Sequence, residues 1–280
     1  MSKIHPTALV DAGAQVADDV EIGPYAVIEP DVSIGEGCRI AGHALIRRYT
    51  SLGRGNRVDP FCVLGGPPQD LKFDPETVTH LRIGDNNVFR EGATLNRGSK
   101  PGGASVVGSR TYFMTAAHLG HDAIVGDDAI LANGAAAGGH ATIGPRTFLS
   151  AHVVIHQFCW IGEGVMTQGN SGFSTHVPPF VTGANINYLV GLNVVGLRRN
   201  PEVSKEDIAQ IKEAFRLTYR SRMPKADVIA AMDAHEEWGG PASRFRDFVR
   251  KVFEAEPPFR RGLCPVRLKS RRDETDARAL

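Results

Sequence analysis

Hydrophobic residues recur at every sixth position along the first part of this 280-residue chain. A small residue often follows the large one four places later. Neither an α-helix nor an alternating strand has a period of six. The apolar positions are Ile4, Val10, Val16, Ile22, Ile28, Ile34, Ile40, Ile46, Leu52, Val58, Leu64, Ile83, Phe89, Leu95, Val107, Phe113, Leu119, Val125, Leu131, Ala137, Ile143, Leu149, Ile155 and Ile161.

A period of six fits a coil of three short strands joined by tight turns, with one large residue per side pointing into a narrow core. Successive coils stack about 4.8 Å apart, so each coil buries the faces of its neighbours. We therefore predict a mainly β protein, a left-handed parallel β-helix of about ten coils of about 18 residues. The left hand follows families that share this repeat, because ordinary parallel crossovers are right-handed.

The period is lost after about residue 176, which indicates a second part of different structure. Ser204 and Asp207 resemble a capping box that opens a helical pattern, and further helices are expected around 225–237 and 242–254. The predicted parts are a β-helix (1–176), a connecting segment that packs back on it (177–203), a small α-helical C-terminal domain (204–256) and a basic tail, which we expect to be largely disordered (257–280).

Composition limits the function classes. A net charge of +1 gives no reason to expect nucleic acid. Cys38, Cys62, Cys159 and Cys264 lack metal-ligand spacing, which is typical of reduced thiols. No apolar run is long enough to span a bilayer, and the N-terminus does not resemble a signal peptide. We expect a cytoplasmic protein without stable membrane insertion.

Two interruptions of the repeat, around residues 65–72 and 96–103, predict loops that project from the wall of the coil. These loops could equally be simple turns carrying solvated charges.

Polar residues cluster where three successive turns stack. Adding 18 to the positions of His121 and Asp122 gives Gly139 and His140, and adding 18 again reaches Gln157, beside His156. An imidazole beside a carboxylate can act as a general base. Gly139 would leave a backbone N–H uncovered that could hold an oxyanion. Alternatively, these are surface histidines and turn glycines, or three histidines that ligate a metal.

Several motifs resemble those of one family, the acyl-carrier-protein-dependent UDP-N-acetylglucosamine O-acyltransferases that begin lipid A synthesis. The resemblance covers roughly residues 3–255. The motifs are Gly66-Pro67-Pro68-Gln69-Asp70-Leu71-Lys72, His118-Leu119-Gly120-His121-Asp122, Leu131-Ala132-Asn133, Gly139-His140, Ile155-His156-Gln157-Phe158, Val177-Pro178-Pro179-Phe180 and Gly191-Leu192-Asn193-Val194-Val195-Gly196-Leu197-Arg198-Arg199.

This resemblance implies transfer of a β-hydroxyacyl chain from acyl carrier protein to the sugar 3-hydroxyl. His121 would remove the hydroxyl proton, Asp122 would orient His121, and the Gly139 N–H would stabilise the oxyanion. It implies no metal or diffusible cofactor, since the acyl group arrives as a thioester on phosphopantetheine. It also implies a homotrimer with sites between subunits.

The resemblance further implies substrate-binding residues. Gly169 aligns with the position that sets acyl length, where a glycine predicts an open channel and a longer chain. Expected sugar and acyl contacts are Gln69, Asp70, Lys72, His118 and His140, and expected contacts on the nucleotide side are His156, Gln157, Asn193 and Arg199. Arg216, Arg220 and Arg222 could form a basic surface for the acidic carrier protein, or an ordinary solvated helix face.

The chain departs from the family pattern at Asn96, where an imidazole is common, and at Val195, where an acidic residue is usual. The stretch 183–187 also departs from the usual form. An N-acyltransferase acting on a 3-amino UDP-sugar is therefore an alternative. A metal-dependent carbonic anhydrase-like trimer and a catalytically silent trimeric scaffold are the others.

Overall fold

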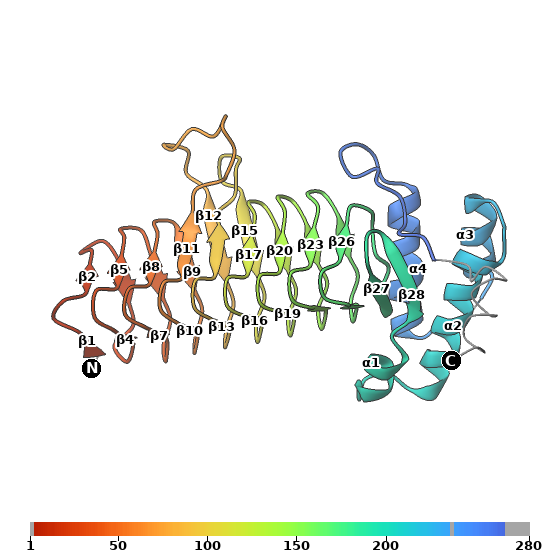
Figure 1. The fold of residues 1–280 in the computed structure, drawn as a ribbon, viewed down its shortest axis with the longest axis horizontal. Coiled ribbons are helices and arrows are strands. Elements are labelled where there is room, and N and C mark those ends of the chain that lie inside the picture. The colour runs from red at the N-terminus through yellow and green to blue at the C-terminus, as the bar shows by residue number, and fades with distance from the viewer. Residues whose placement is uncertain (1–2, 236–237, 267–280) are drawn as a thin grey trace, which may run out of the picture.

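A computed structural model describes residues 3–235 and 238–266, and its strands form a long three-sided prism (Figure 1). In these residues, sheet 1 has eleven strands, sheet 2 nine and sheet 3 eight. Sheet 1 contains β1 (Lys3–Ile4), β4 (Glu21–Ile22), β7 (Arg39–Ile40), β10 (Arg57–Val58), β13 (Val88–Phe89), β16 (Tyr112–Phe113), β19 (Ile130–Leu131), β22 (Phe148–Leu149), β25 (Met166–Thr167), β27 (Val181–Ala184) and β28 (Tyr188–Leu192).

The other two sheets complete the prism. Sheet 2 contains β2 (Leu9–Val10), β5 (Val27–Ile28), β8 (Leu45–Ile46), β11 (Val63–Gly66), β14 (Thr94–Asn96), β17 (His118–Leu119), β20 (Ala136–Ala137), β23 (Val154–Ile155) and β26 (Gly172–Phe173). Sheet 3 contains β3 (Gln15–Val16), β6 (Ser33–Ile34), β9 (Thr50–Leu52), β12 (His80–Ile83), β15 (Ala104–Val107), β18 (Ile124–Val125), β21 (Thr142–Ile143) and β24 (Trp160–Ile161).

The register explains the period of six. Val27 pairs with Leu45 and Ile28 with Ile46, so residues 18 apart lie directly above one another in parallel strands. The second residue of each two-residue strand points inward, and both Ile28 and Ile46 are buried. The small residues four places later, such as Ala117, are buried in the same core. The predicted parallel coil is confirmed.

The three sheets meet along three edges, which define where each turn lies. We call them edge X, where the chain passes from sheet 1 to sheet 2, edge Y, from sheet 2 to sheet 3, and edge Z, from sheet 3 to sheet 1. Both interruptions leave the prism at edge Y. The first is the loop of residues 67–79 between β11 and β12, which stands out from the prism, and the second is residues 97–103 between β14 and β15 (Figure 1).

Among the described residues, four helices lie at the C-terminal end of the prism (Figure 1). They are α1 (Val194–Arg199), α2 (Lys205–Arg220), α3 (Lys225–Asp233) and α4 (Gly240–Phe253). The expected capping box is present at the start of α2, since the Ser204 side chain accepts from Asp207 N and the Asp207 side chain accepts from Ser204 N. None of the helices in the described part of the chain is long and apolar enough to cross a membrane.

The connecting segment contains regular structure that its sequence did not reveal. β27 and β28 form an antiparallel hairpin, and β27 adds to the end of sheet 1 beside β25. Asn185 and Asn187 in the hairpin turn both have left-handed backbones, with φ of 51° and 49°. Asparagine tolerates this conformation better than most residues, so the two asparagines were the available turn signal.

The basic tail requires a correction. We expected disorder from residue 257 onward, but residues 257–266 pack against the prism, and residues 267–280 lie outside the described residues. Cys264 is fully buried, and its N–H donates to His176 O at 2.7 Å. The Phe259 ring stacks on Trp160 at 5.2 Å. The count of basic residues gave no sign of these contacts, which depend on Phe259 and Cys264.

Candidate active site

Three successive turns of edge Y bring the candidate catalytic residues together. These turns follow β17, β20 and β23, and they stack through backbone hydrogen bonds. His140 N donates to His121 O at 2.9 Å, and Phe158 N donates to Gly139 O at 3.0 Å. The 18-residue spacing therefore placed Gly139 and His140 correctly above His121 and Asp122, with Gln157 in the turn beyond.

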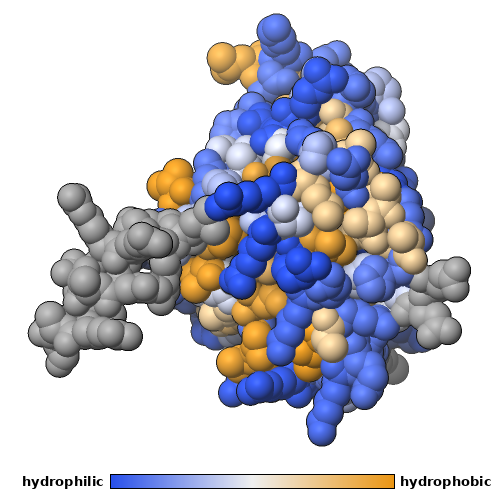
Figure 2. Space-filling view, turned by 90° about the vertical axis from the view of Figure 1, so that its right-hand side faces the viewer, coloured by the Kyte–Doolittle hydropathy of each residue, from blue (hydrophilic) through white to orange (hydrophobic). Residues whose placement is uncertain are grey.

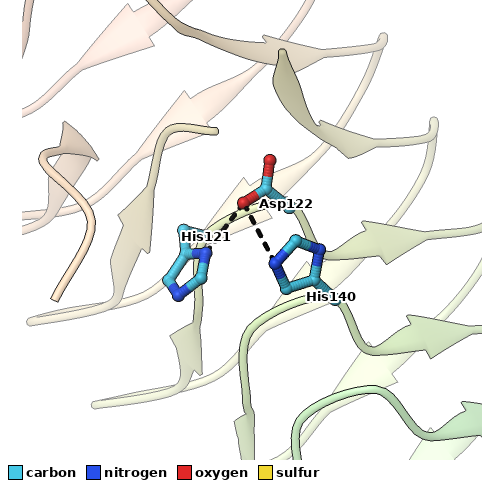
Figure 3. Close-up of side chains that lie close together, drawn as sticks. All are labelled: His121, Asp122 and His140. Carbon is cyan, nitrogen blue, oxygen red and sulfur yellow. Dashed lines mark hydrogen bonds and ion pairs between the residues drawn. The ribbon is translucent and has the colours of Figure 1, made fainter. Parts of the chain in front are cut away.

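His121 and Asp122 form a hydrogen-bonded pair (Figure 3). His121 Nδ1 lies 2.8 Å from Asp122 Oδ2, and the two side chains are 19% and 12% exposed. Both carboxylate oxygens of Asp122 also accept from the N–H of Ser99, each at 3.1 Å. His140 Nε2 lies 3.5 Å from the same Oδ2. The carboxylate of Asp122 is thus held from three directions.

Electrostatics keep this carboxylate ionised. Burial raises the pKa of Asp122, but hydrogen bonds from His121 and Ser99, together with the nearby His140, outweigh it and bring the pKa to about 2. An ionised carboxylate can only accept hydrogen bonds, so His121 must donate through Nδ1. Its Nε2 then carries the free lone pair, as a general base requires.

Gly139 lies directly beside this free nitrogen. A Cβ at position 139 would stand 2.7 Å from His121 Nε2 and 2.8 Å from Cε1, closer than real contacts allow. Only glycine therefore fits next to the imidazole in its present position. Within the described residues the Gly139 N–H donates no hydrogen bond, whereas the N–H groups of Gly138 and His140 are both satisfied. The Nε2 atom of His121, which can act as a base, and the unpaired N–H of Gly139 thus belong to neighbouring groups.

Two further histidines line the site. His140 meets the His121 ring edge-on at 5.2 Å and stacks on Phe158 at 4.6 Å. His118 projects from the outer face of β17, where its Nδ1 lies 2.8 Å from Thr94 Oγ1. Burial lowers the pKa of both His118 and His140. Both rings are thereby biased toward the neutral form, which can donate and accept hydrogen bonds at once.

The metal alternative needed three converging histidines. In the part of the chain that the structure describes, ligand atoms of His121, Asp122 and His140 lie within 4.8 Å of one another, which makes two imidazoles and one carboxylate. The third histidine of the predicted set, His156, instead points its Nδ1 toward Gln157 O at 3.1 Å. The Nδ1 of His121 is engaged by Asp122. The geometry favours a base and its orienting carboxylate over the three-histidine metal site.

The first loop carries three of the expected substrate contacts to the same edge. Gln69, Asp70 and Lys72 are all exposed on the loop of residues 67–79. Asp70 Oδ1 accepts from Lys72 N at 2.9 Å, which gives the loop a local turn. His156 and Gln157 are exposed at edge Y as well.

The remaining expected contacts lie on other edges. Gly169 is in the turn between β25 and β26, at edge X. Asn193 caps α1 and donates to the carbonyl of Gly164, which belongs to a turn of edge Z. Arg199, the last residue of α1, is exposed. A single chain therefore does not bring Gly169, Asn193 and Arg199 to His121.

Ser99 and Phe158 are site residues that the sequence pattern did not predict. Ser99 lies in the second interruption of the repeat, which was the available signal. Phe158 occupies the turn position 18 residues beyond His140, so the spacing that found the site could also have named it.

Comparisons with known proteins agree with this geometry. A family model described as UDP N-acetylglucosamine O-acyltransferase, domain 2, matches residues 176–264, and one described as bacterial transferase hexapeptide (six repeats) matches residues 13–48. The acyl-[acyl-carrier-protein]–UDP-N-acetylglucosamine O-acyltransferase of Anaeromyxobacter sp. (strain Fw109-5) is 42% identical over 249 residues, which is 88% of this chain and 96% of that protein.

Further relatives extend the match to structure. The enzyme of the same name from Myxococcus xanthus is 46% identical over 236 residues, covering 84% of this chain and 91% of the relative. The crystal structure of UDP-N-acetylglucosamine O-acyltransferase from Moraxella catarrhalis superposes with a TM-score of 0.87 at 32% identity, covering 94% of this chain and 99% of that one.

The hexapeptide-repeat prism, together with these matches, identifies the protein as a hexapeptide-repeat acyltransferase. The predicted fold class is confirmed, a left-handed parallel β-helix followed by a small α-helical domain. The chain belongs to the UDP-N-acetylglucosamine O-acyltransferase family.

Proposed function

We propose that this protein transfers a β-hydroxyacyl chain from acyl carrier protein to the 3-hydroxyl of UDP-N-acetylglucosamine, the first step of lipid A synthesis. The observation that carries the proposal is the His121–Asp122 pair with its free Nε2 beside Gly139. The names of the relatives support the same donor and acceptor.

The chemistry follows from the positions of these groups. His121 Nε2 takes the proton of the sugar hydroxyl as its oxygen attacks the thioester carbonyl. Asp122 stabilises the imidazolium that forms, and the unpaired Gly139 N–H donates to the oxyanion of the tetrahedral intermediate. When this intermediate collapses, the phosphopantetheine sulfur leaves as a thiolate and takes from His121 the proton that came from the sugar hydroxyl. Every step uses side chains and backbone of the protein, with no metal or diffusible cofactor.

The other expected contacts receive roles by position. Gln69, Asp70 and Lys72 would contact the sugar and acyl chain from their loop, while His118 and His140 would do so from the prism. His156, Gln157, Asn193 and Arg199 would contact the nucleotide. Gly169 would leave the acyl channel open for a longer chain.

The acceptor could instead be a UDP-sugar with a 3-amino group. Asn96 stands where the family often has an imidazole, and its Oδ1 is buried without a partner among the described residues. Val195, which stands where an acidic residue is usual, is 60% exposed on α1. Both changes alter groups expected near the acceptor, whereas the His121–Asp122 chemistry would serve either nucleophile.

The protein should acylate UDP-N-acetylglucosamine when it is incubated with this sugar and with carrier proteins that bear β-hydroxyacyl chains of several lengths. The 3-amino analogue serves as the competing acceptor, and product is measured by mass spectrometry with and without EDTA. Preference for the amino sugar would redirect the reaction to N-acylation. Loss of activity in EDTA, restored by zinc or cobalt, would favour the metal-dependent alternative. No product with either acceptor would contradict the proposed function.

A threefold assembly would complete the site. Gly169 lies on edge X, Asn193 contacts a turn of edge Z and Arg199 ends α1. His121 lies on edge Y, so a neighbouring prism would supply these residues. The outer faces of the prism also carry exposed apolar residues that suit a subunit contact, namely Ile124 at 46%, Val154 at 54% and Met166 at 36%.

Carrier protein would dock near α2. Arg220 and Lys212 line a groove together with Leu192 and Phe215. Arg216 pairs with Glu213 at 2.7 Å, so its charge is largely compensated within the helix. Viewed from the helical end, the surface shows extensive hydrophilic cover interrupted by separate hydrophobic patches (Figure 2).

Mixing two inactive variants should restore activity if sites form between subunits. His121→Ala and Arg199→Ala should each be severely impaired alone. After purification through both tags every trimer contains both variants, and one of its three sites pairs an intact His121 with an intact Arg199, so we expect about a third of wild-type activity. Co-expression with two affinity tags, followed by the acylation assay, measures this. Activity no higher than the sum of the two parents would place both residues in one chain's site.

A further inference from the structure

Arg97 is a buried arginine whose role the proposed reaction does not explain. Arg97 is 5% exposed, and no carboxylate in the described part of the chain forms an ion pair with it. The guanidinium instead donates to two backbone carbonyls, those of Pro75 at 3.2 Å and Thr77 at 3.3 Å. Burying a charge is costly unless it is well bonded, so this placement needs a specific purpose.

Both carbonyls belong to the loop of residues 67–79, which carries Gln69, Asp70 and Lys72. The guanidinium carbon also lies 5.3 Å from the ring centre of Phe73, on the same loop, and 5.3 Å from that of Tyr49, on the prism. Arg97 therefore attaches residues 73–77 of the loop to the prism through hydrogen bonds and cation–π contacts.

The neighbours of Arg97 fix the rest of the loop and the catalytic pair. Asn96 Nδ2 donates to Pro67 O at 2.8 Å, at the start of the loop, and Arg97 N donates to Gly66 O at 2.9 Å. Two residues further on, Ser99 N donates to the carboxylate of Asp122. Residues 96–99 thus form hydrogen bonds with the loop at one end and with Asp122 of the His121–Asp122 pair at the other.

We propose that Arg97 is a positioning residue that holds the 67–79 loop in the conformation that binds the acceptor. The proposal rests on the proposed function in one respect, that this loop contacts the substrate. A loop that is properly placed only part of the time weakens apparent affinity in proportion to the competent fraction. Once substrate is bound, the loop is in place and the chemistry at His121 proceeds normally.

The planar, forked shape of the Arg97 guanidinium is the property that attaches the loop. Arginine can donate to two carbonyls at once while its faces lie against two rings. Lysine keeps the positive charge but has neither the fork nor the flat faces. Arg97→Lys therefore separates anchoring of the loop from simple attraction of an anionic nucleotide, because attraction would survive in the lysine variant.

Arg97→Lys should raise KM for UDP-N-acetylglucosamine roughly tenfold while kcat stays within about threefold of wild type. Amide hydrogen exchange in residues 67–79 should become faster, with the rest of the prism unchanged. The matched control is Arg48→Lys, since Arg48 lies over the same Tyr49 ring at 4.6 Å but pairs with Asp31 and has no hydrogen bond to the loop. It should change neither KM nor exchange.

Phe73→Leu removes the ring contact from the loop side without altering the prism, and should shift KM and exchange in the same direction by a smaller factor. A wild-type KM and exchange pattern in Arg97→Lys would overturn the proposal, as would a raised KM without faster exchange in the loop. The exchange comparison needs no substrate. It decides whether Arg97 anchors the loop even if the protein fails to acylate UDP-N-acetylglucosamine, a failure that would count against the proposed function alone.

Discussion

His121→Ala should lower kcat by roughly 10²–10⁴-fold, the range that positioned general bases contribute. The substitution removes the imidazole whose Nε2 lies beside Gly139, and with it the proposed acceptor for the proton of the attacking hydroxyl. Single-turnover acylation of UDP-N-acetylglucosamine by β-hydroxyacyl carrier protein measures the chemical step directly. KM should change little, because the loop and the other histidines remain.

His43→Ala is a suitable control for this substitution. His43 is also a turn histidine of the prism, but it is exposed and lies at edge X, stacked between the rings of Tyr25 and Phe61. It should retain wild-type kcat. If His121→Ala kept more than about a tenth of wild-type kcat, the proton would have to leave by another route, and the assignment of the base would be wrong.

The repeat made much of this site predictable. Because each coil contains 18 residues, adding 18 to His121 and Asp122 was enough to stack Gly139 and His140 over them. The same arithmetic fails wherever the chain leaves the prism. The contact of Ser99 with Asp122 depends on the path of an inserted loop, which no periodicity describes.

Contacts between distant segments were equally invisible. Arg244 on α4 lies 2.5 Å from the buried Glu163, 81 residues earlier in a turn of edge Z, and Arg146 pairs with the same carboxylate. Glu163 is 7% exposed, so loss of either arginine would leave part of a buried charge uncompensated. The Arg244–Glu163 ion pair joins the helical domain to the prism. In the sequence, however, each of these residues looks like an ordinary surface charge. The packing of residues 257–266 escaped prediction for the same reason.

Asp122→Asn should lower kcat by roughly 10²–10⁴-fold although the side chain keeps its shape, since the corresponding change in a serine protease triad costs about 10⁴-fold. The carboxylate forces His121 to donate from Nδ1. An asparagine amide can donate to Nδ1 instead, which moves the imidazole proton to Nε2, where the lone pair is required. The imidazolium formed in the reaction also loses its counter-charge. Single-turnover kinetics at saturating acceptor should show the loss in kcat.

Asp128→Asn provides the matched control. Asp128 has nearly the same left-handed backbone as Asp122, with φ of 58° against 56°, and pairs with Arg110 at 2.7 Å away from the dyad. Asparagine suits that conformation as well as aspartate does, so backbone strain changes equally in the two variants. A large loss of kcat in both variants would mean that the loss comes from the backbone rather than from the tautomer of His121.

The pH dependence of stability gives an independent check on Asp122. Its pKa is held at about 2 in the folded protein, below the ordinary value of 3.8, so ionisation of this carboxylate stabilises the native state. That contribution is fully present above about pH 5 and is lost as the pH falls toward 2. The difference in unfolding free energy between wild type and Asp122→Asn should therefore shrink over this acidic range. A difference that stayed constant down to pH 2 would show that the folded protein gains no stability from ionised Asp122, and the tautomer argument would fall with it.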